Sequence, residues 1–175
     1  MAMRAGGILC ILVLATICIV LGSSIAAGSS AVAQSRSKRS LLDFGTMISC
    51  VLPNVGDALS AALRYNNYGC WCGVGGGGPT VDSIDQCCKV HDACYGSVET
   101  QGCGDPKYED YHWRYSGGRV FCEATLWQRL FGGGNNECQK AICECDRTAV
   151  VCFEAHNHIY NSNNINYDDR SHCAK

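Results

Sequence analysis

The sequence lacks any run or stripe of positive charge. Its 175 residues include 14 basic and 16 acidic side chains, for a formal net charge of −2. Domains that bind nucleic acid cluster lysine and arginine on one face, so we expect no nucleic-acid partner. The chain also has no N-x-S/T sequon, and N-glycosylation is therefore not expected.

Long hydrophobic runs are scarce as well. The longest apolar run, at 8–21, has 14 residues, whereas a helix that spans a membrane needs roughly 20. Arg4 precedes this run, and Ala31-Val32-Ala33 forms an A-x-A cleavage site after it. We interpret 1–33 as a signal peptide and expect a secreted, extracellular protein. The alternative is a membrane anchor.

A dibasic pair, Lys38-Arg39, follows the cleavage site. It indicates a propeptide at 34–39 and a mature domain at 40–175; the alternative is a polar spacer. The mature domain would hold 10 basic and 16 acidic residues, for a net charge of −6. This charge favours zwitterionic over strongly anionic lipid surfaces.

Cysteine is abundant, with 13 of the 15 cysteines in 40–175. In an exported chain this density indicates a disulfide framework, and the wide spread disfavours a zinc domain. Because 13 is odd, at least one thiol is expected to be free or bonded to another chain.

The residue pattern predicts a mainly α, disulfide-rich domain. Apolar spacings of three and four indicate a helix at 40–51. Helices are also expected at 58–65, at 82–96, where Asp82 or Ser83 can act as the cap, and at 137–153, which Asn135-Asn136 opens. The segment 68–79 has six glycines and must be a loop, and a small hairpin is expected at 114–122. Residues 96–118 are otherwise expected to be irregular.

The two long helices carry cysteine pairs with equal spacing. Cys87 and Cys94 are seven residues apart, and so are Cys145 and Cys152. Seven residues are two helical turns, so antiparallel helices can pair Cys87 with Cys152 while Cys94 meets Cys145. Connectivity does not follow from sequence alone, but this register would place Asp146 close to His91.

His91 and Asp146 would then form a general-base arrangement. A carboxylate bonded to one ring nitrogen fixes the tautomer and leaves the other nitrogen free to accept a proton. No serine at a sharp elbow is evident in the sequence, so water is the expected nucleophile.

The adjacent carboxylate of Asp92 suggests a cation. Calcium prefers six to eight oxygen ligands, many of them carbonyls, and a glycine-rich loop can curl around an ion. Simple flexibility is the alternative for the loop, while a phosphate-binding loop would need a following lysine and helix. Together these residues predict metal-assisted hydrolysis.

Three motifs carry a resemblance to a known family. Cys87-Cys88-x-x-His91-Asp92-x-Cys94, the loop beginning Tyr68-Gly69-Cys70-Trp71-Cys72-Gly73, and Ala141-Ile142-Cys143-Glu144-Cys145-Asp146 occur in the sequence. They resemble the signatures of secreted phospholipases A2, with spacing closest to the pancreatic and elapid-venom type. The resemblance covers essentially all of 40–175.

The resemblance implies a fold and an activity. The fold would have two long antiparallel disulfide-linked helices, an N-terminal helix, a calcium loop and a small β-hairpin. The activity would be calcium-dependent hydrolysis of the sn-2 ester of glycerophospholipids. The implied site comprises a base and its partner (His91, Asp146), supporting tyrosines (Tyr95, Tyr115), calcium ligands (Asp92 and the carbonyls of Trp71, Gly73 and Gly75) and an acyl channel (Leu41, Phe44, Ile48).

The resemblance also implies a disulfide pairing. The family has two cysteines in the segment 116–131, whereas this chain has only Cys122, and Phe131 stands where the second is expected. The implied free thiol is therefore Cys143. The implied pairs are Cys50–Cys122, Cys70–Cys173, Cys72–Cys88, Cys87–Cys152, Cys94–Cys145 and Cys103–Cys138.

Two other functions remain as alternatives. One is a non-catalytic toxin or receptor ligand on the same scaffold, and the other is a disulfide-rich structural protein without a site. For the enzyme we expect one calcium ion per chain, a monomer, and a phospholipid membrane or micelle surface as the partner.

Overall fold

The computed structural model describes residues 43–167 and Cys173. The expected signal peptide, the propeptide and Leu41 lie outside the described residues. A helical segment at 43–51 is followed by η1 (Pro53–Val55) and α3 (Ala58–Tyr65). The longer elements that follow are α4 (Ser83–Thr100), α5 (Leu126–Phe131) and α6 (Glu137–His156), with the short turns η2 (Pro106–Tyr108), η3 (Asn157–Ile159) and η4 (Ser162–Asn164).

The sheet is a two-stranded hairpin of β1 (Arg114–Ser116) and β2 (Arg119–Phe121), paired antiparallel. Gly117 and Gly118 connect the strands, and both have positive φ values of 57° and 80°. Two-residue hairpin turns of this handedness require such values at both positions, which glycine adopts without strain. The mainly helical fold with a small hairpin is therefore confirmed. Among the described helices, none combines the length and apolar character needed to cross a membrane.

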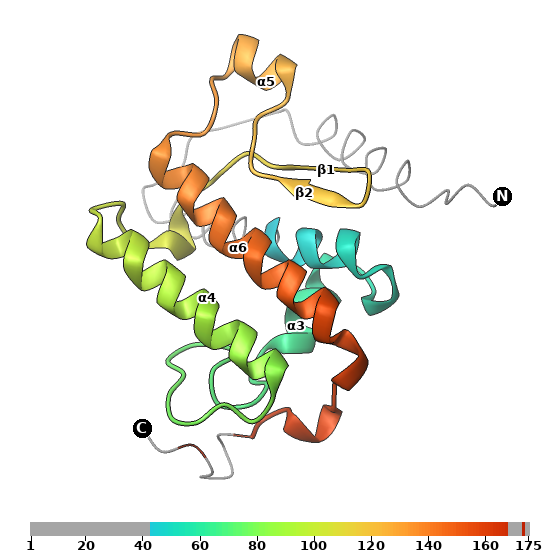
Figure 1. The fold of residues 1–175 in the computed structure, drawn as a ribbon. Helices are drawn as coiled ribbons and strands as arrows, with labels where there is room; N and C mark the ends of the chain where they lie inside the picture. The colour runs from blue at the N-terminus through green and yellow to red at the C-terminus, as the bar shows by residue number, and fades with distance from the viewer. Residues whose placement is uncertain (1–42, 168–172, 174–175) are drawn as a thin grey trace, which may run out of the picture.

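The two long helices lie side by side (Figure 1). Helix α4 starts at Asp82, whose carboxylate accepts the N–H groups of Ile84 and Asp85, each at 2.9 Å. Helix α6 starts at Asn136 with a reciprocal capping box to Gln139. These caps satisfy backbone donors that have no partner within the helix.

Disulfides fix the antiparallel register of the helices. Cys87 bonds to Cys152 and Cys94 to Cys145, as the seven-residue spacing predicts. The structure also forms three further bonds that the family resemblance implies, and these are Cys70–Cys173, Cys72–Cys88 and Cys103–Cys138.

The bond between Cys103 and Cys138 joins the two long helices at a further point. Cys103 lies just after the end of α4, and Cys138 lies in the first turn of α6. Their Cα atoms are 5.3 Å apart. The end of α4 is thus held against the start of α6, as an antiparallel pair requires.

The remaining pair differs from the expectation. Cys143 is not a free thiol but is bonded to Cys122, with a Cα–Cα distance of 5.6 Å. The expected Cys50–Cys122 bond is therefore wrong, and Cys50 is also disulfide-bonded. The physical reason is that Cys122 follows β2 directly and is buried, as are Ile142 and Cys143 of α6, so that Cys143 is within reach.

The core lies between the segment 43–51, α3, α4 and α6. Its largest fully buried side chains include Tyr68, Met47, Ile84 and Phe153. The ring of Tyr65 stacks on Phe153 with centroids 4.1 Å apart. This packing supports one side of α6, and the disulfides hold the other helix against it.

Candidate active site

His91 and Asp146 meet between the two long helices. The Nε2 atom of His91 lies 2.6 Å from Oδ1 of Asp146, which is fully buried. An ionised carboxylate only accepts hydrogen bonds, so Nε2 donates, and in the neutral imidazole Nδ1 is then the nitrogen without a proton. Phe44 stacks on the imidazole at 5.1 Å and an angle of 3°. The ring is thus held by a hydrogen bond at one edge and by an aromatic face.

Two tyrosines share the Asp146 carboxylate. Tyr95 donates to Oδ1 at 2.6 Å, and Tyr111 donates to Oδ2. The expected role of Tyr115 is therefore wrong: Tyr115 lies on β1, and Tyr111, in the irregular segment before the hairpin, takes its place. Burial, and then the charge of Asp146, raise the pKa values of both Tyr95 and Tyr111 well above the ordinary tyrosine range. Both hydroxyls therefore stay protonated and act as donors.

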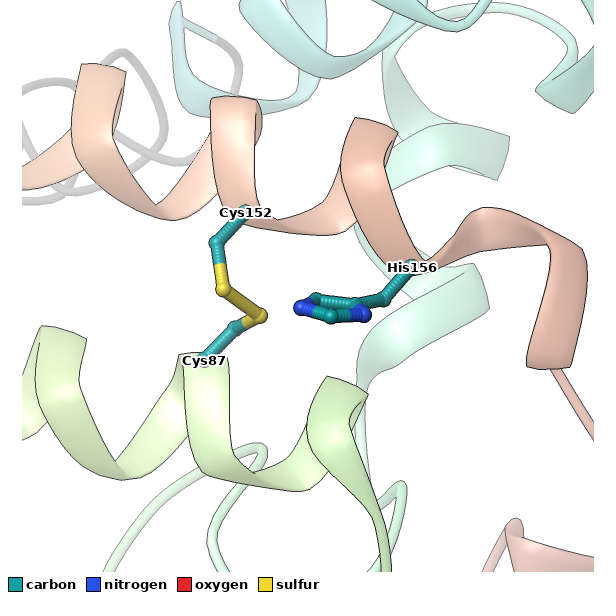
Figure 2. Close-up of side chains that lie close together, drawn as sticks. All are labelled: Cys87, Cys152 and His156. Carbon is teal, nitrogen blue, oxygen red and sulfur yellow. A yellow bond between two sulfur atoms is a disulfide. The ribbon is translucent and has the colours of Figure 1, made fainter.

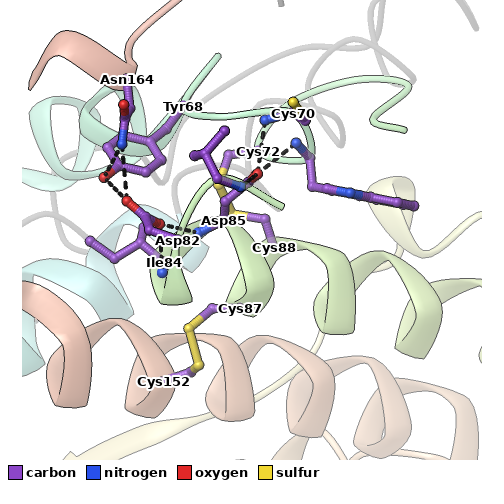
Figure 3. The surroundings of a disulfide bond; sticks show 12 residues. Tyr68, Cys70, Cys72, Asp82, Ile84, Asp85, Cys87, Cys88, Cys152 and Asn164 are labelled. Carbon is purple, nitrogen blue, oxygen red and sulfur yellow. Dashed lines mark hydrogen bonds between the residues drawn. A yellow bond between two sulfur atoms is a disulfide. The ribbon is translucent and has the colours of Figure 1, made fainter. Parts of the chain in front are cut away.

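The glycine-rich loop is held by Asp85, a residue that the sequence pattern did not single out. Its fully buried carboxylate accepts the backbone N–H groups of Cys70 at 2.9 Å, Trp71 at 2.7 Å and Val81 at 3.0 Å (Figure 3). Asp85 lies in the first turn of α4. The start of the helix thus fixes both ends of the loop, and the disulfide between Cys72 and Cys88 ties the loop to the next turn.

The side chain of Trp71 bonds to the far end of its own loop. Its indole Nε1 donates to the carbonyl of Gly78 at 3.0 Å, and Gly77 N–H donates to Cys70 O at 2.9 Å. The Nζ atom of Lys89 lies 4.8 Å from the centroid of the Trp71 ring, a distance typical of a cation–π contact. The side chain at position 71 therefore shapes the loop, in addition to any role of its carbonyl.

Asp92 is on the same helix as His91 and lines a cavity of about 420 Å³ together with it. Within the described part of the chain no hydrogen bond or ion pair of its carboxylate is found. Burial raises the pKa of Asp92, while the nearby His91 and Lys107 act in the opposite direction. A half-buried carboxylate without a close partner is a group that a cation would stabilise.

The cavity brings together most of the expected site. Its lining includes Trp71 and Gly73 beside His91 and Asp92, whereas Gly75 lines an adjoining cavity that also contacts Trp71 and Gly73. The apolar lining residues are Phe44, Ala62, Leu63, Tyr65 and Phe153. Ile48, expected in the acyl channel, is instead fully buried in the core. Ile48 lies one turn further along the same side of the helix as Phe44, and only Phe44 reaches the cavity.

Among the described residues, one group of three side chains that could ligate a metal lies close together. It consists of Cys87, Cys152 and His156 (Figure 2). The two sulfur atoms are bonded to each other, and metal ligation by cysteine requires a thiolate. This group is therefore a structural disulfide with a neighbouring imidazole. A hard cation is better matched by an oxygen donor such as the carboxylate of Asp92.

The fold and site define a disulfide-rich helical protein in which the histidine of a histidine–carboxylate pair lines a largely apolar cavity. The family model described as phospholipase A2 matches residues 41–165. The chain is 41% identical over 135 residues to neutral phospholipase A2 ammodytin I2 of Vipera ammodytes ammodytes, covering 77% of this chain and 85% of the relative.

Two further relatives are similar at comparable length. Basic phospholipase A2 1 of Naja sagittifera is 37% identical over 130 residues, covering 74% of this chain and 90% of the relative. Group IIE secretory phospholipase A2 of Mus musculus is 38% identical over 130 residues, covering 74% of this chain and 80% of the relative. The chain therefore belongs to the phospholipase A2 family of enzymes.

Proposed function

We propose that this protein is a secreted, calcium-dependent phospholipase A2 that hydrolyses the sn-2 ester of glycerophospholipids to a fatty acid and a lysophospholipid. The observation that carries the proposal is the contact between His91 and the buried Asp146, with the unpaired carboxylate of Asp92 in the same cavity. A positioned base and a cation site side by side suit hydrolysis of an ester by water.

His91 acts as the general base. Because Nε2 donates to Asp146, Nδ1 accepts a proton from water as the water attacks the ester carbonyl, and it returns this proton to the leaving alkoxide. The imidazolium that forms is stabilised by the Asp146 carboxylate. The hydrogen bonds from Tyr95 and Tyr111 hold this carboxylate in place throughout.

The residues around Asp92 suit calcium. The carboxylate of Asp92 and the carbonyls of Trp71, Gly73 and Gly75 would hold the ion, and all of these donors are oxygen atoms. When bound, the ion would polarise the ester carbonyl and stabilise the negative charge that develops on its oxygen. The three loop hydrogen bonds to Asp85 keep the loop in one conformation before the ion arrives.

The cavity suits a lipid substrate. Phe44, Leu63 and Phe153 give it an apolar wall for an acyl chain, and Lys107 supplies a positive charge for a phosphate group. Leu63 is 55% exposed and Val74 in the loop is 96% exposed. These apolar side chains suit a peripheral contact between the cavity and a membrane or micelle.

Secretion is supported by the six disulfides of the described residues, because such bonds persist in oxidising compartments. The name of the mouse relative also describes a secretory protein. We propose that the enzyme acts as a monomer and carries one calcium ion.

Release of fatty acid from phosphatidylcholine vesicles, with and without a calcium chelator, tests this proposal. We expect release only with calcium, and we expect His91→Gln to reduce it on the order of a thousandfold or more while the thermal unfolding temperature stays close to that of the wild type. His158→Gln, a change of the same type outside the cavity, is the matched control and should retain activity. A folded wild-type protein without calcium-dependent release would sink the proposal and favour the non-catalytic toxin or receptor ligand.

A further inference from the structure

Helix α5 exposes an apolar face that has no part in the cavity. Its residues Leu126, Trp127, Leu130 and Phe131 are 64–80% exposed, and none of them belongs to the hydrophobic core. The four positions lie on one side of the helix, where Trp127 stacks on Phe131 with centroids 5.6 Å apart. Such a patch on a water-soluble surface marks a site of interaction.

The polar groups of α5 are already satisfied within the chain. Gln128 forms a reciprocal capping box with Thr125. Arg129 donates to the Ala124 carbonyl at 3.2 Å and lies 3.5 Å from Glu123. A protein partner normally adds about one hydrogen bond per 100–200 Å² of interface, and this helix offers few free groups for that purpose.

The size of the face suits either kind of partner, so the lack of free polar groups on α5 is what favours lipid over a second copy of this chain. The four side chains leave roughly 500 Å² of apolar surface in water, which is about the apolar share of the ~800 Å² that each partner of a stable protein complex buries. A lipid surface needs no directional bonds, because insertion of tryptophan, phenylalanine and leucine is driven by burial alone.

The charges beneath the helix suit lipid headgroups. Both Arg114 and Arg129 pair with the single carboxylate of Glu123, at 3.8 and 3.5 Å, so these three side chains together carry one excess positive charge. Tryptophan beside arginine is the composition found where proteins meet the membrane–water interface. Figure 1 shows α5 beyond the hairpin, at the opposite end of the molecule from the loop after Tyr68.

We propose that α5 is a lipid-surface anchor that is separate from the cavity and works without calcium or catalysis. It inserts Trp127 and Phe131 among the headgroups, with Leu126 and Leu130 beside them. The inference goes beyond the proposed function, since it assigns membrane attachment to a surface that lies away from the reacting groups.

Binding to vesicles of diether phosphatidylcholine in the presence of a calcium chelator tests the anchor, because this lipid has no ester to hydrolyse. The double variant Trp127→Ser, Phe131→Ser is expected to bind about tenfold more weakly than the wild type, or weaker still. Val151→Ser, which changes a 47% exposed apolar residue on α6, is the matched control and should bind like the wild type.

Fluorescence with brominated lipid locates the contact. The wild type has three tryptophans, and Trp127→Phe, which keeps an aromatic side chain and the binding, should lose the part of the quenching that comes from Trp127. Hydrolysis of dispersed short-chain lipid, measured on the same variants, should be unchanged, so a failure of the proposed enzymatic function would be seen separately. Equal vesicle binding by the double variant would overturn the anchor, as would a concentration-dependent dimer that the double variant abolishes while vesicle binding persists.

Discussion

Gly69 lies directly against the carboxylate of Asp85. A Cβ atom at position 69 would be 2.3 Å from Asp85 Cγ, and Gly69 has a φ of +64°. No side chain fits between the loop and the start of α4 without displacing the carboxylate that holds the loop.

The substitution Gly69→Ala is therefore expected to destabilise the protein strongly. The left-handed backbone costs about 1–2 kcal/mol for a residue with a Cβ atom, and the clash adds to this. Gly133→Ala provides the control, because Gly133 has a φ of +80° but no atom near its Cβ position. In urea, the free energy of unfolding of Gly69→Ala should be lower than that of Gly133→Ala by about 2 kcal/mol or more. An equal decrease in the two variants would contradict the clash.

Asp85→Asn is expected to weaken calcium binding, measured by calorimetry, by about 10–100-fold, the range seen for groups that orient metal ligands. The amide nitrogen of asparagine cannot accept a hydrogen bond, so at least one of the three loop N–H groups loses its partner. Asp57→Asn removes the same charge from an exposed cap of α3 and should leave the affinity unchanged. Wild-type affinity in Asp85→Asn would show that the loop is organised by other contacts.

Tyr111→Phe and Tyr115→Phe form a matched pair that tests the network around Asp146. Tyr111→Phe removes a buried hydrogen bond to a charged group and should lower the free energy of unfolding by about 1.5–3 kcal/mol. It should also reduce kcat several-fold, because Asp146 then holds His91 less firmly. Tyr115→Phe should change neither the free energy of unfolding nor kcat by a measurable amount. Larger effects of Tyr115→Phe than of Tyr111→Phe would favour Tyr115 as the partner of Asp146, as the sequence predicted.

Tyr68 is expected to make stability depend on pH in the alkaline range. Its hydroxyl donates to Asp82 at 2.5 Å (Figure 3), and burial, followed by this hydrogen bond, raises the pKa of Tyr68 from 10.0 to about 12. Because the pKa is raised in the folded state, the protonated Tyr68 hydroxyl contributes fully to the free energy of unfolding below pH 10.0. This contribution is lost as the pH rises toward about 12.

The free energy of unfolding of the wild type and of Tyr68→Phe, measured in urea at several pH values, checks this expectation. The difference should be about 1.5–3 kcal/mol at neutral pH and should shrink by about 1.4 kcal/mol for each pH unit above 10.0. A difference that stays constant up to about pH 12 would contradict it.

Local patterns in the sequence were sufficient for much of the fold. The helix at 58–65 has the expected bounds, and the start of α4 follows from its cap, Asp82, which acts over only a few residues. The pairing of Cys87 with Cys152 follows from helical geometry. His91 and Asp146 meet because this register is correct.

Contacts between distant or irregular segments were harder to predict. Tyr111 lies in a segment without helical or strand periodicity, so the sequence could not set its position against α6. Asp85 resembles an ordinary acidic residue in the first turn of a helix, although its partners lie up to 15 residues away. Helix α5 has only six residues, too few for its apolar spacing to be recognised as periodic.

The neighbouring cysteines 87 and 88 bond in different directions, one to α6 and the other to the glycine-rich loop. A protease that cuts the exposed backbone near Val74 would therefore release no fragment, because Cys72 and Cys88 bridge the cut. Under non-reducing conditions the nicked protein would stay one molecule, heavier by the one water that the cleavage adds, and it would separate into two chains only after reduction. Where such an enzyme meets a protease, a single cut in this loop therefore does not break the molecule apart.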